Sequence, residues 1–214
     1  TQEQARRFYN AIDSKIRNTV FNYKDNDSEK FSILEMMLKN IANPLGAERI
    51  RNLLLKVLDR SSEAFETVAL SCYLSGNNSA LSTDILFSYF DCKSYEDTQR
   101  YVNEANGLMR ELDISVDTCD DDQDYYDIRS KLFLYHCKKA LADDKRLKHA
   151  YSNVINNFLE RVPVFKIYRY NLFKRSAYDA KLFHSLFKEK ANEIYDKLYD
   201  YEANPYTLQQ WALC

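Results

Sequence analysis

Residues 82–90, Ser-Thr-Asp-Ile-Leu-Phe-Ser-Tyr-Phe, open the stretch 81–137 that decides the fold of this chain. These nine residues predict a short amphipathic helix, and Asp-Cys-Lys at 91–93 predicts a tight connection after it. A second helix is expected from Ser94, because a hydroxyl residue followed three positions later by Asp97 approximates a capping box. Its apolar residues recur at spacings of three and four, which indicates one buried face: Tyr101, Val102, Ala105, Leu108, Met109 and Leu112.

The second half of this stretch alternates apolar and polar side chains. Residues 114–117 (Ile-Ser-Val-Asp) and 125–129 (Tyr-Tyr-Asp-Ile-Arg) predict two short strands, and the acidic run 120–122 lies between them. Two helices joined by a tight turn and followed by a hairpin predict a winged helix-turn-helix. Because the first helix of this unit is expected to begin near Ser61, the winged-helix domain is expected over residues 61–141.

The composition of the chain indicates helices throughout. It has 214 residues with only three glycines and three prolines, and 17 tyrosines and 12 phenylalanines supply bulky core side chains. So few glycine and proline residues favour long helices and short loops. The expected fold class is therefore mainly α: a helical bundle or arm with an embedded winged helix-turn-helix that carries a small β-hairpin.

Helical segments are expected on both sides of the winged unit. Residues 1–60 predict a helical lid or arm, in which Asn-Pro-Leu-Gly at 43–46 stops a helix. Residues 142–214 predict a helical tail at the start of a repeat-like array, although no fixed period recurs in the sequence. Within this tail, one long helix is expected over residues 178–201.

Further signals mark the ends of the tail helices. Pro163 predicts a break, and Asn204-Pro205 predicts the start of a last helix at Tyr206. The chain begins and ends inside helical patterns, so it is expected to be a piece of a longer protein.

Charge and cysteine content restrict the environment of the chain. The formal net charge of −2 favours neither nucleic acid nor a membrane surface. Five cysteines at irregular spacings are typical of reduced thiols in a cytoplasmic protein. The sequence holds no apolar run near the ~20 residues that a membrane span needs. A cytoplasmic location without membrane contact is therefore expected.

The charges of the winged unit argue against duplex DNA as a partner. Residues 93–111 hold three basic and four acidic side chains, and the wing adds Asp120, Asp121, Asp122 and Asp124. A surface that contacts phosphates is basic, because neutralised phosphates release counterions and supply much of the affinity. Protein partners are expected instead.

Residues 161–190 differ from the rest of the chain, with eight basic residues, two acidic residues and interleaved aromatic residues. Rings among cations can bind single-stranded nucleic acid, with Lys166, Arg169, Lys174 and Arg175 as the candidate surface. In the competing interpretation, the rings belong to the core and the bases form a solvated face. We favour the second interpretation, because amphipathic helices routinely carry such faces.

The residues present no pattern for catalysis or for metal binding. The three histidines stand singly, and the three glycines are isolated, so no zinc spacing and no phosphate loop is found. No serine, threonine or cysteine stands in a nucleophile elbow. This segment is therefore expected to be no enzyme and to bind no metal or cofactor of its own.

Three segments resemble the region that follows the ATPase core in bacterial STAND NTPases, the signal-transduction ATPases with numerous domains. Residues 31–38 (Phe-Ser-Ile-Leu-Glu-Met-Met-Leu) with 50–58 look like their helical lid. Residues 126–133 (Tyr-Asp-Ile-Arg-Ser-Lys-Leu-Phe) are similar to the aromatic-x-x-Arg-His-x-Leu segment that ends their winged helix. Residues 204–213 (Asn-Pro-Tyr-Thr-Leu-Gln-Gln-Trp-Ala-Leu) resemble a tail motif of antiviral members.

This resemblance implies a regulatory segment that couples partner sensing to nucleotide-dependent switching in antiphage immune signalling. ATP or ADP with Mg would bind the parent chain, and the partners would be its upstream ATPase core, a trigger protein and further copies. Arg129 matches the family's arginine, whereas Ser130 replaces the histidine that contacts ADP, so both are candidate switch contacts. Two alternatives stay open: a helical adaptor without an ATPase, and a nucleic-acid-binding module that uses residues 161–190.

Overall fold

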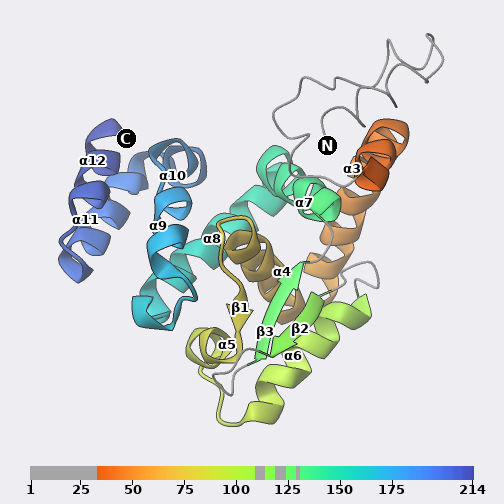
Figure 1. Ribbon diagram of the computed structural model, residues 1–214, viewed down its shortest axis with the longest axis horizontal. Helices are drawn as coiled ribbons and strands as arrows, with labels where there is room; N and C mark the ends of the chain where they lie inside the picture. The colour runs from red at the N-terminus through yellow and green to blue at the C-terminus, as the bar shows by residue number, and fades with distance from the viewer. Residues whose placement is uncertain (1–32, 109–113, 119–123, 129–130) are drawn as a thin grey trace.

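The computed structural model describes residues 33–108, 114–118, 124–128 and 131–214, and its fold is mainly helical with one small antiparallel sheet (Figure 1). The expected fold class, mainly α with a small β-hairpin, is thereby confirmed. The helix expected at the start of the chain lies outside the described residues. Helix α3 and the pair α11–α12 lie at opposite ends of the molecule (Figure 1).

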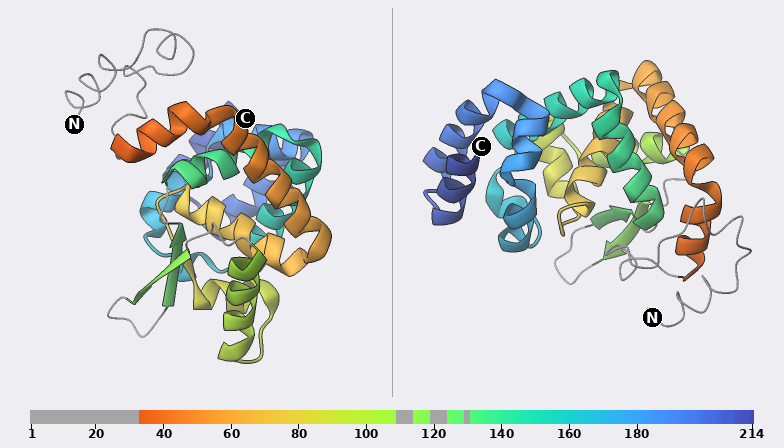
Figure 2. Two further views of the ribbon diagram at one scale, coloured as in Figure 1. Left: turned by 90° about the vertical axis from the view of Figure 1, so that its right-hand side faces the viewer. Right: turned by 90° about the horizontal axis from the view of Figure 1, so that it is seen from above.

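Helix α3 (Ile33–Arg60) is one continuous helix of 28 residues. The predicted stop at residues 43–46 is therefore wrong. A proline inside a helix removes one backbone hydrogen bond and pushes against the preceding turn, which bends a helix without having to end it. In agreement, α3 changes direction along its length (Figure 2). Its second half is held to the start of α8 by two ion pairs, Arg51–Asp144 at 2.8 Å and Asp59–Arg146 at 2.7 Å.

The central unit begins with α4 (Ser62–Ser75), whose N-cap Ser61 accepts a hydrogen bond from the backbone N–H of Ala64 at 3.2 Å. This start agrees with the helix expected near Ser61. Three further elements follow before the hairpin: β1 (Leu81–Ser82), α5 (Thr83–Phe90) and α6 (Tyr95–Leu108).

The hairpin consists of β2 (Ile114–Thr118) and β3 (Asp124–Ile128), and β1 pairs with the other edge of β3, which gives the order β1-β3-β2. In this sheet Tyr126 stands opposite Leu81 on one side and opposite Val116 on the other. The sequence did not predict β1, because a strand of two residues shows no alternation. Its pairing brings the start of α5 against the hairpin.

The tail starts from α7 (Lys131–Asp143) and α8 (Lys145–Arg161). The break predicted at Pro163 is present, since α8 ends there and a short 3-10 turn follows. The last helix starts where the sequence predicts it: Asn204 Oδ1 accepts a hydrogen bond from the N–H of Tyr206 at 2.8 Å, with Pro205 as the first residue of the helix. The other tail elements are η2 (Val164–Lys166), α9 (Tyr170–Ala177), α10 (Ala180–Phe187), η3 (Lys188–Lys190), α11 (Ala191–Tyr201) and α12 (Pro205–Leu213).

The single helix predicted over residues 178–201 is wrong, because the chain breaks at Lys188, where φ is 52°. The break folds α10 back onto α11 and brings the rings of Phe183 and Tyr195 to 4.9 Å. In one straight helix these two residues would lie about 18 Å apart along the axis. Packing of the two rings thus favours two short helices over one long helix.

One hydrophobic core runs through the described residues. At its centre the ring of Tyr73 on α4 makes edge contacts with Phe158 of α8 and Phe173 of α9, at 5.7 and 5.5 Å. The Tyr73 hydroxyl donates to the carbonyl of Ala177 at 3.1 Å, and burial raises the pKa of this phenol. The core crosses the expected boundary at residues 141/142, and the division into regions 1–60, 61–141 and 142–214 stays a prediction.

Candidate functional site

The four candidate basic residues lie on η2, on α9 and in the loop between them, and they do not form one open surface. Arg169 and Arg175 are exposed, whereas Lys166 and Lys174 are half-buried. The ammonium of Lys166 donates to Ser88 Oγ at 2.9 Å, and that of Lys174 donates to Glu202 Oε1 at 2.9 Å. Half of the predicted surface is therefore engaged inside the chain.

Two cations of the basic stretch contact the end of helix α5. Arg161 Nη1 donates to the carbonyl of Tyr89 at 3.1 Å, and Lys166 binds the neighbouring Ser88. The C-terminal end of a helix carries partial negative charge, so cations are favourable there. We call Arg161, Lys166 and the Ser88–Tyr89 end of α5 the tail–α5 junction, because it fastens the tail to the central unit.

Contacts of Ser79 and Tyr168 extend this attachment of the tail to the central unit. Ser79, just before β1, donates to the carbonyl of Tyr168 at 2.8 Å. The ring of Tyr168 packs against that of Tyr125 on β3 at 4.9 Å, and the guanidinium of Arg169 lies 4.8 Å from the same Tyr168 ring. Tyr168 is thus held between the hairpin and an arginine of its own segment.

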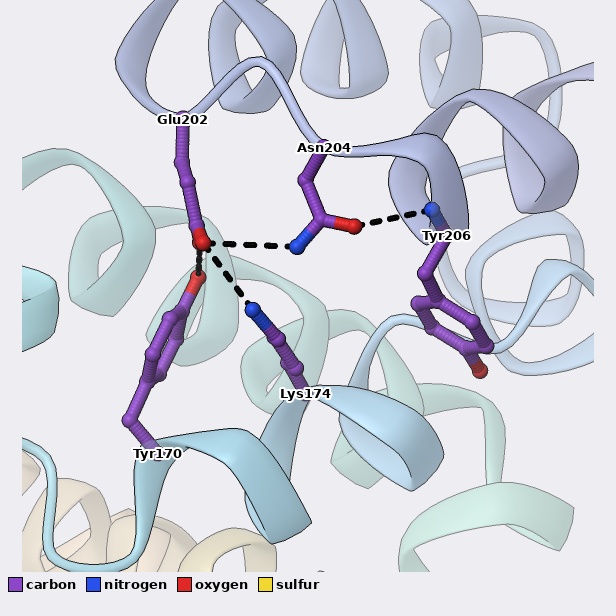
Figure 3. Close-up of polar contacts among 5 residues, drawn as sticks. All are labelled: Tyr170, Lys174, Glu202, Asn204 and Tyr206. Carbon is purple, nitrogen blue, oxygen red and sulfur yellow. Dashed lines mark hydrogen bonds and ion pairs between the residues drawn. The ribbon is translucent and has the colours of Figure 1, made fainter.

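The second engaged lysine belongs to the Glu202 cluster, which comprises Tyr170, Lys174, Glu202 and Asn204 (Figure 3). Tyr170 donates its hydroxyl hydrogen to Glu202 Oε2 at 2.5 Å, and Asn204 Nδ2 donates to Oε1 at 3.3 Å. Figure 3 shows these side chains converging with Lys174 on one carboxylate from α9 and from the connection between α11 and α12. The cluster ties α9 to the last two helices.

Burial alone would raise the pKa of the Glu202 carboxyl, but hydrogen bonds from Tyr170, Lys174 and Asn204 bring it below its ordinary value. The pKa of the Tyr170 hydroxyl is raised, mainly by burial. Since the Lys174 side chain is only 13% exposed, its ammonium is poorly placed to bind a phosphate. Glu202 is 28 residues away in the sequence, so sequence reasoning missed it as the partner of Lys174.

The aromatic residues of the basic stretch are mostly part of the core. Phe173 and Tyr178 are buried, and Tyr168 and Tyr170 are half-buried, while Phe165 is 79% exposed. This arrangement favours the interpretation in which the rings pack inside and the remaining bases form a solvated face. Binding of single-stranded nucleic acid by this stretch stays an untested prediction.

The candidate switch contacts Arg129 and Ser130 lie outside the described residues. In the sequence they stand between the end of β3 at Ile128 and the start of α7 at Lys131. Their role at a nucleotide therefore stays a prediction.

The outward face of α6 forms an open, shallow depression, lined by Tyr95, Glu96, Gln99, Arg100, Asn103 and Glu104. Two carboxylates and one guanidinium stand on this face, so its charge is slightly negative. A second carboxylate-centred group, the Asp124 cluster, borders it and comprises Tyr95, Gln99, Asp124 and Tyr126.

In the Asp124 cluster, the hydroxyl of Tyr95 donates to the Asp124 carboxylate. Gln99 Nε2 donates to Asp124 Oδ2 at 3.1 Å and to the hydroxyl oxygen of Tyr126 at 2.7 Å. These contacts hold α6 against β3. The hydrogen bond that the Tyr95 hydroxyl donates to Asp124 raises the pKa of this hydroxyl. Sequence reasoning treated Asp124 only as a wing charge and missed this cluster.

Within the described residues, no group of three or more histidine, cysteine, aspartate or glutamate side chains could hold a metal ion. In the same part of the chain, no helix has the length and apolar character of a membrane span. The cysteines described there are free thiols: Cys72, Cys92, Cys137 and Cys214. No protein-family model matches this chain, and the searches of curated proteins and of solved structures also returned no match.

Proposed function

We propose that this chain is a regulatory, protein-binding segment of a STAND-type ATPase that acts in antiphage signalling. In this proposal residues 61–141 form a winged helix whose α6 face contacts a protein rather than DNA. The observation that carries the proposal is the slightly acidic outward face of α6. In the proposed winged helix, α6 corresponds to the helix that a DNA-binding member would place in the major groove.

Electrostatics support a protein partner. A helix that enters a DNA groove gains affinity by neutralising phosphates, whereas Glu96, Glu104 and the nearby Asp124 would be repelled by them. Three bases of the tail already have partners inside the chain, because Arg161 and Lys166 bind the end of α5 and Lys174 binds Glu202.

A coupling role is supported by the way the tail is attached. The tail and the central unit share one core around Tyr73, and the tail–α5 junction adds charged contacts to it. Since packed interiors transmit displacement rather than absorb it, a partner that moves α9 or α10 would also move α5 and the hairpin. Such a rigid connection suits a segment that passes partner binding on to an ATPase core.

The parent gene tests the ATPase part of this proposal. A Gly-x-x-x-x-Gly-Lys-Ser/Thr loop after a predicted strand is expected within about 300 residues upstream of this segment. If no such loop is encoded there, the ATPase assignment fails and a helical adaptor remains.

The protein-binding part is tested with the parent ATPase domain as the probe. Replacing Glu96 and Glu104 by lysine (Glu96→Lys with Glu104→Lys) should weaken binding of this chain to that domain by about tenfold, because two charges on the contact face are reversed. The matched control is Glu48→Lys with Glu189→Lys, which makes the same charge change at exposed positions on α3 and η3. Equal weakening by both pairs would refute the α6 assignment.

A titration with duplex DNA provides the complementary test. The full chain should show no binding to a ~20-base-pair duplex below about 1 μM at physiological salt, since the outward face of α6 is not basic. Sub-micromolar binding measured by fluorescence anisotropy would contradict the proposal.

A further inference from the structure

A cleft of about 300 Å³ lies in the tail, away from α6, between the end of α8, η2 and α11. Its walls are mostly apolar and include Leu159, Val162, Val164, Ile194, Leu198 and Tyr201. Ligand pockets in proteins span about 300–1,000 Å³, so this cleft lies at the lower end of the range. Its size suits one large side chain better than a whole cofactor.

The two opposite charges at the polar edge of the cleft neutralise each other. It carries Asn156, Glu160 and Lys197, and the Lys197 ammonium lies 2.9 Å from Glu160 Oε1. An occupant with a net charge would have to break this pair or remain without a counter-charge from the described lining. An uncharged occupant leaves the ion pair intact and gains from the apolar walls.

A large exposed ring lines the cleft, and a second belongs to the residue that follows a lining residue in the chain. Tyr201 lines it and is 60% exposed, and Phe165, the residue after the lining Val164, is 79% exposed. A small molecule that filled only the cleft would leave both rings in water. Exposed aromatic residues beside a concave apolar site are typical of the centre of a protein interface, where one anchor side chain enters a pocket.

We propose that this cleft binds a single large uncharged side chain, aromatic or aliphatic, from a partner protein whose adjoining surface covers Tyr201 and Phe165. The proposal does not depend on the function proposed for α6. The two surfaces share no residue, so each can fail while the other stands.

The test uses ¹⁵N-labelled full chain and a twelve-residue Gly/Ser peptide with one central tryptophan. Backbone amide signals of residues 194–201 should shift on titration, with an affinity in the millimolar range expected for one anchor. The same peptide with alanine at the centre should bind at least about tenfold more weakly. Peptides with a central glutamate or lysine should not shift these signals, and binding of either as tight as that of the tryptophan peptide would refute an uncharged occupant.

Variants of the chain assign the binding to the cleft. Val164→Trp is expected to fill the cleft and abolish the shifts, whereas Leu172→Trp, at an exposed position on α9, should leave them unchanged. If Val164→Trp fails to fold, Tyr201→Ala is the substitute, because it removes an exposed wall of the cleft and should weaken binding several-fold. Shifts that survive both Val164→Trp and Tyr201→Ala, or no shifts with the unaltered chain, would overturn the proposal.

Two controls distinguish other occupants. N-acetyltryptophanamide should bind more weakly than the peptide, since it lacks the chain that covers Tyr201 and Phe165; equal or tighter binding would overturn the partner assignment in favour of a small-molecule site. Analytical ultracentrifugation of the chain and of Tyr201→Ala should give the same mass. A dimer that dissociates on this substitution would make a second copy the occupant and would also overturn the assignment.

Discussion

The Glu202 cluster and the Asp124 cluster use similar groups in different surroundings. In each, a carboxylate accepts hydrogen bonds from a tyrosine hydroxyl and from a carboxamide nitrogen. The Glu202 cluster adds a lysine whose side chain is 13% exposed, whereas the Asp124 cluster includes Tyr95, which is 48% exposed. Both carboxylates are half-buried, so the two clusters differ in their donors rather than in their acceptors. The difference teaches that a charged, largely buried partner, more than the hydrogen-bonding groups that the clusters share, distinguishes the Glu202 cluster from the Asp124 cluster.

The largest effect on stability is expected from removing the carboxylate of Glu202. Glu202→Ala should lower the free energy of unfolding by about 2 kcal/mol, because Tyr170, Lys174 and Asn204 each lose an acceptor and all three are half-buried. Urea denaturation followed by circular dichroism measures this loss.

The matched change at the other cluster should cost less. Asp124→Ala should lower the free energy of unfolding by about 1 kcal/mol or less, since water can replace the lost acceptor for the exposed Tyr95. The same urea titration applies. Equal losses for Glu202→Ala and Asp124→Ala would break the comparison.

The pH dependence of the Glu202 cluster should follow its pKa. The folded-state pKa of Glu202 lies below its unfolded value, so its contribution to stability is present above the unfolded value, near 4.5, and is lost as the pH falls through the folded one. The loss of unfolding free energy caused by Glu202→Gln should therefore be largest at pH 7 and become progressively smaller below pH ~4.5. Urea midpoints of both proteins at pH 7, 5 and 3.5 provide the check, and a constant difference would contradict the prediction.

The smallest effect is expected from the exposed bases. Arg169→Glu with Arg175→Glu should change the free energy of unfolding by no more than about 0.5 kcal/mol, because both side chains are exposed. Lys166→Glu with Lys174→Glu, the matched pair, should cost clearly more, since both ammonium groups bind internal partners.

The same two pairs test the nucleic-acid alternative by titration with fluorescent single-stranded DNA. The solvated-face interpretation predicts weak binding that neither pair changes. Lost binding with a reduced salt slope in Arg169→Glu with Arg175→Glu would favour the nucleic-acid module instead.

Local signals in the sequence predicted element starts well. Ser61 and Asn204-Pro205 were identified because an N-cap needs only one side chain and the next few backbone N–H groups. The two wrong predictions concern the places where helices end. Residues 43–46 contain strong helix breakers yet remain helical. At Lys188 the helix breaks although the helical sequence pattern continues, and this break lets the ring of Phe183 pack against that of Tyr195.

The candidate site was less predictable than the fold. The basic stretch was correctly located as a charge pattern, but the partners of its lysines are Ser88, 78 residues from Lys166, and Glu202, 28 residues from Lys174. One sequence does not show which distant side chains meet, so the candidate surface and the internal contacts could not be separated. Similarly, Asp124 joins α6 to the hairpin only after β1, β2 and β3 are in register.

The tail–α5 junction has a consequence for the response of this chain to polyanions such as heparin. A polyanion that takes all the N–H donors of Arg161 and Lys166 must displace Tyr89 and Ser88 of α5. A polyanion that uses them therefore binds preferentially to a form whose tail is detached, and ligands that prefer an opened form lower the melting temperature. Heparin that uses only Arg169 and Arg175 would raise it instead. The sign of the thermal shift thus reports whether the tail is still attached.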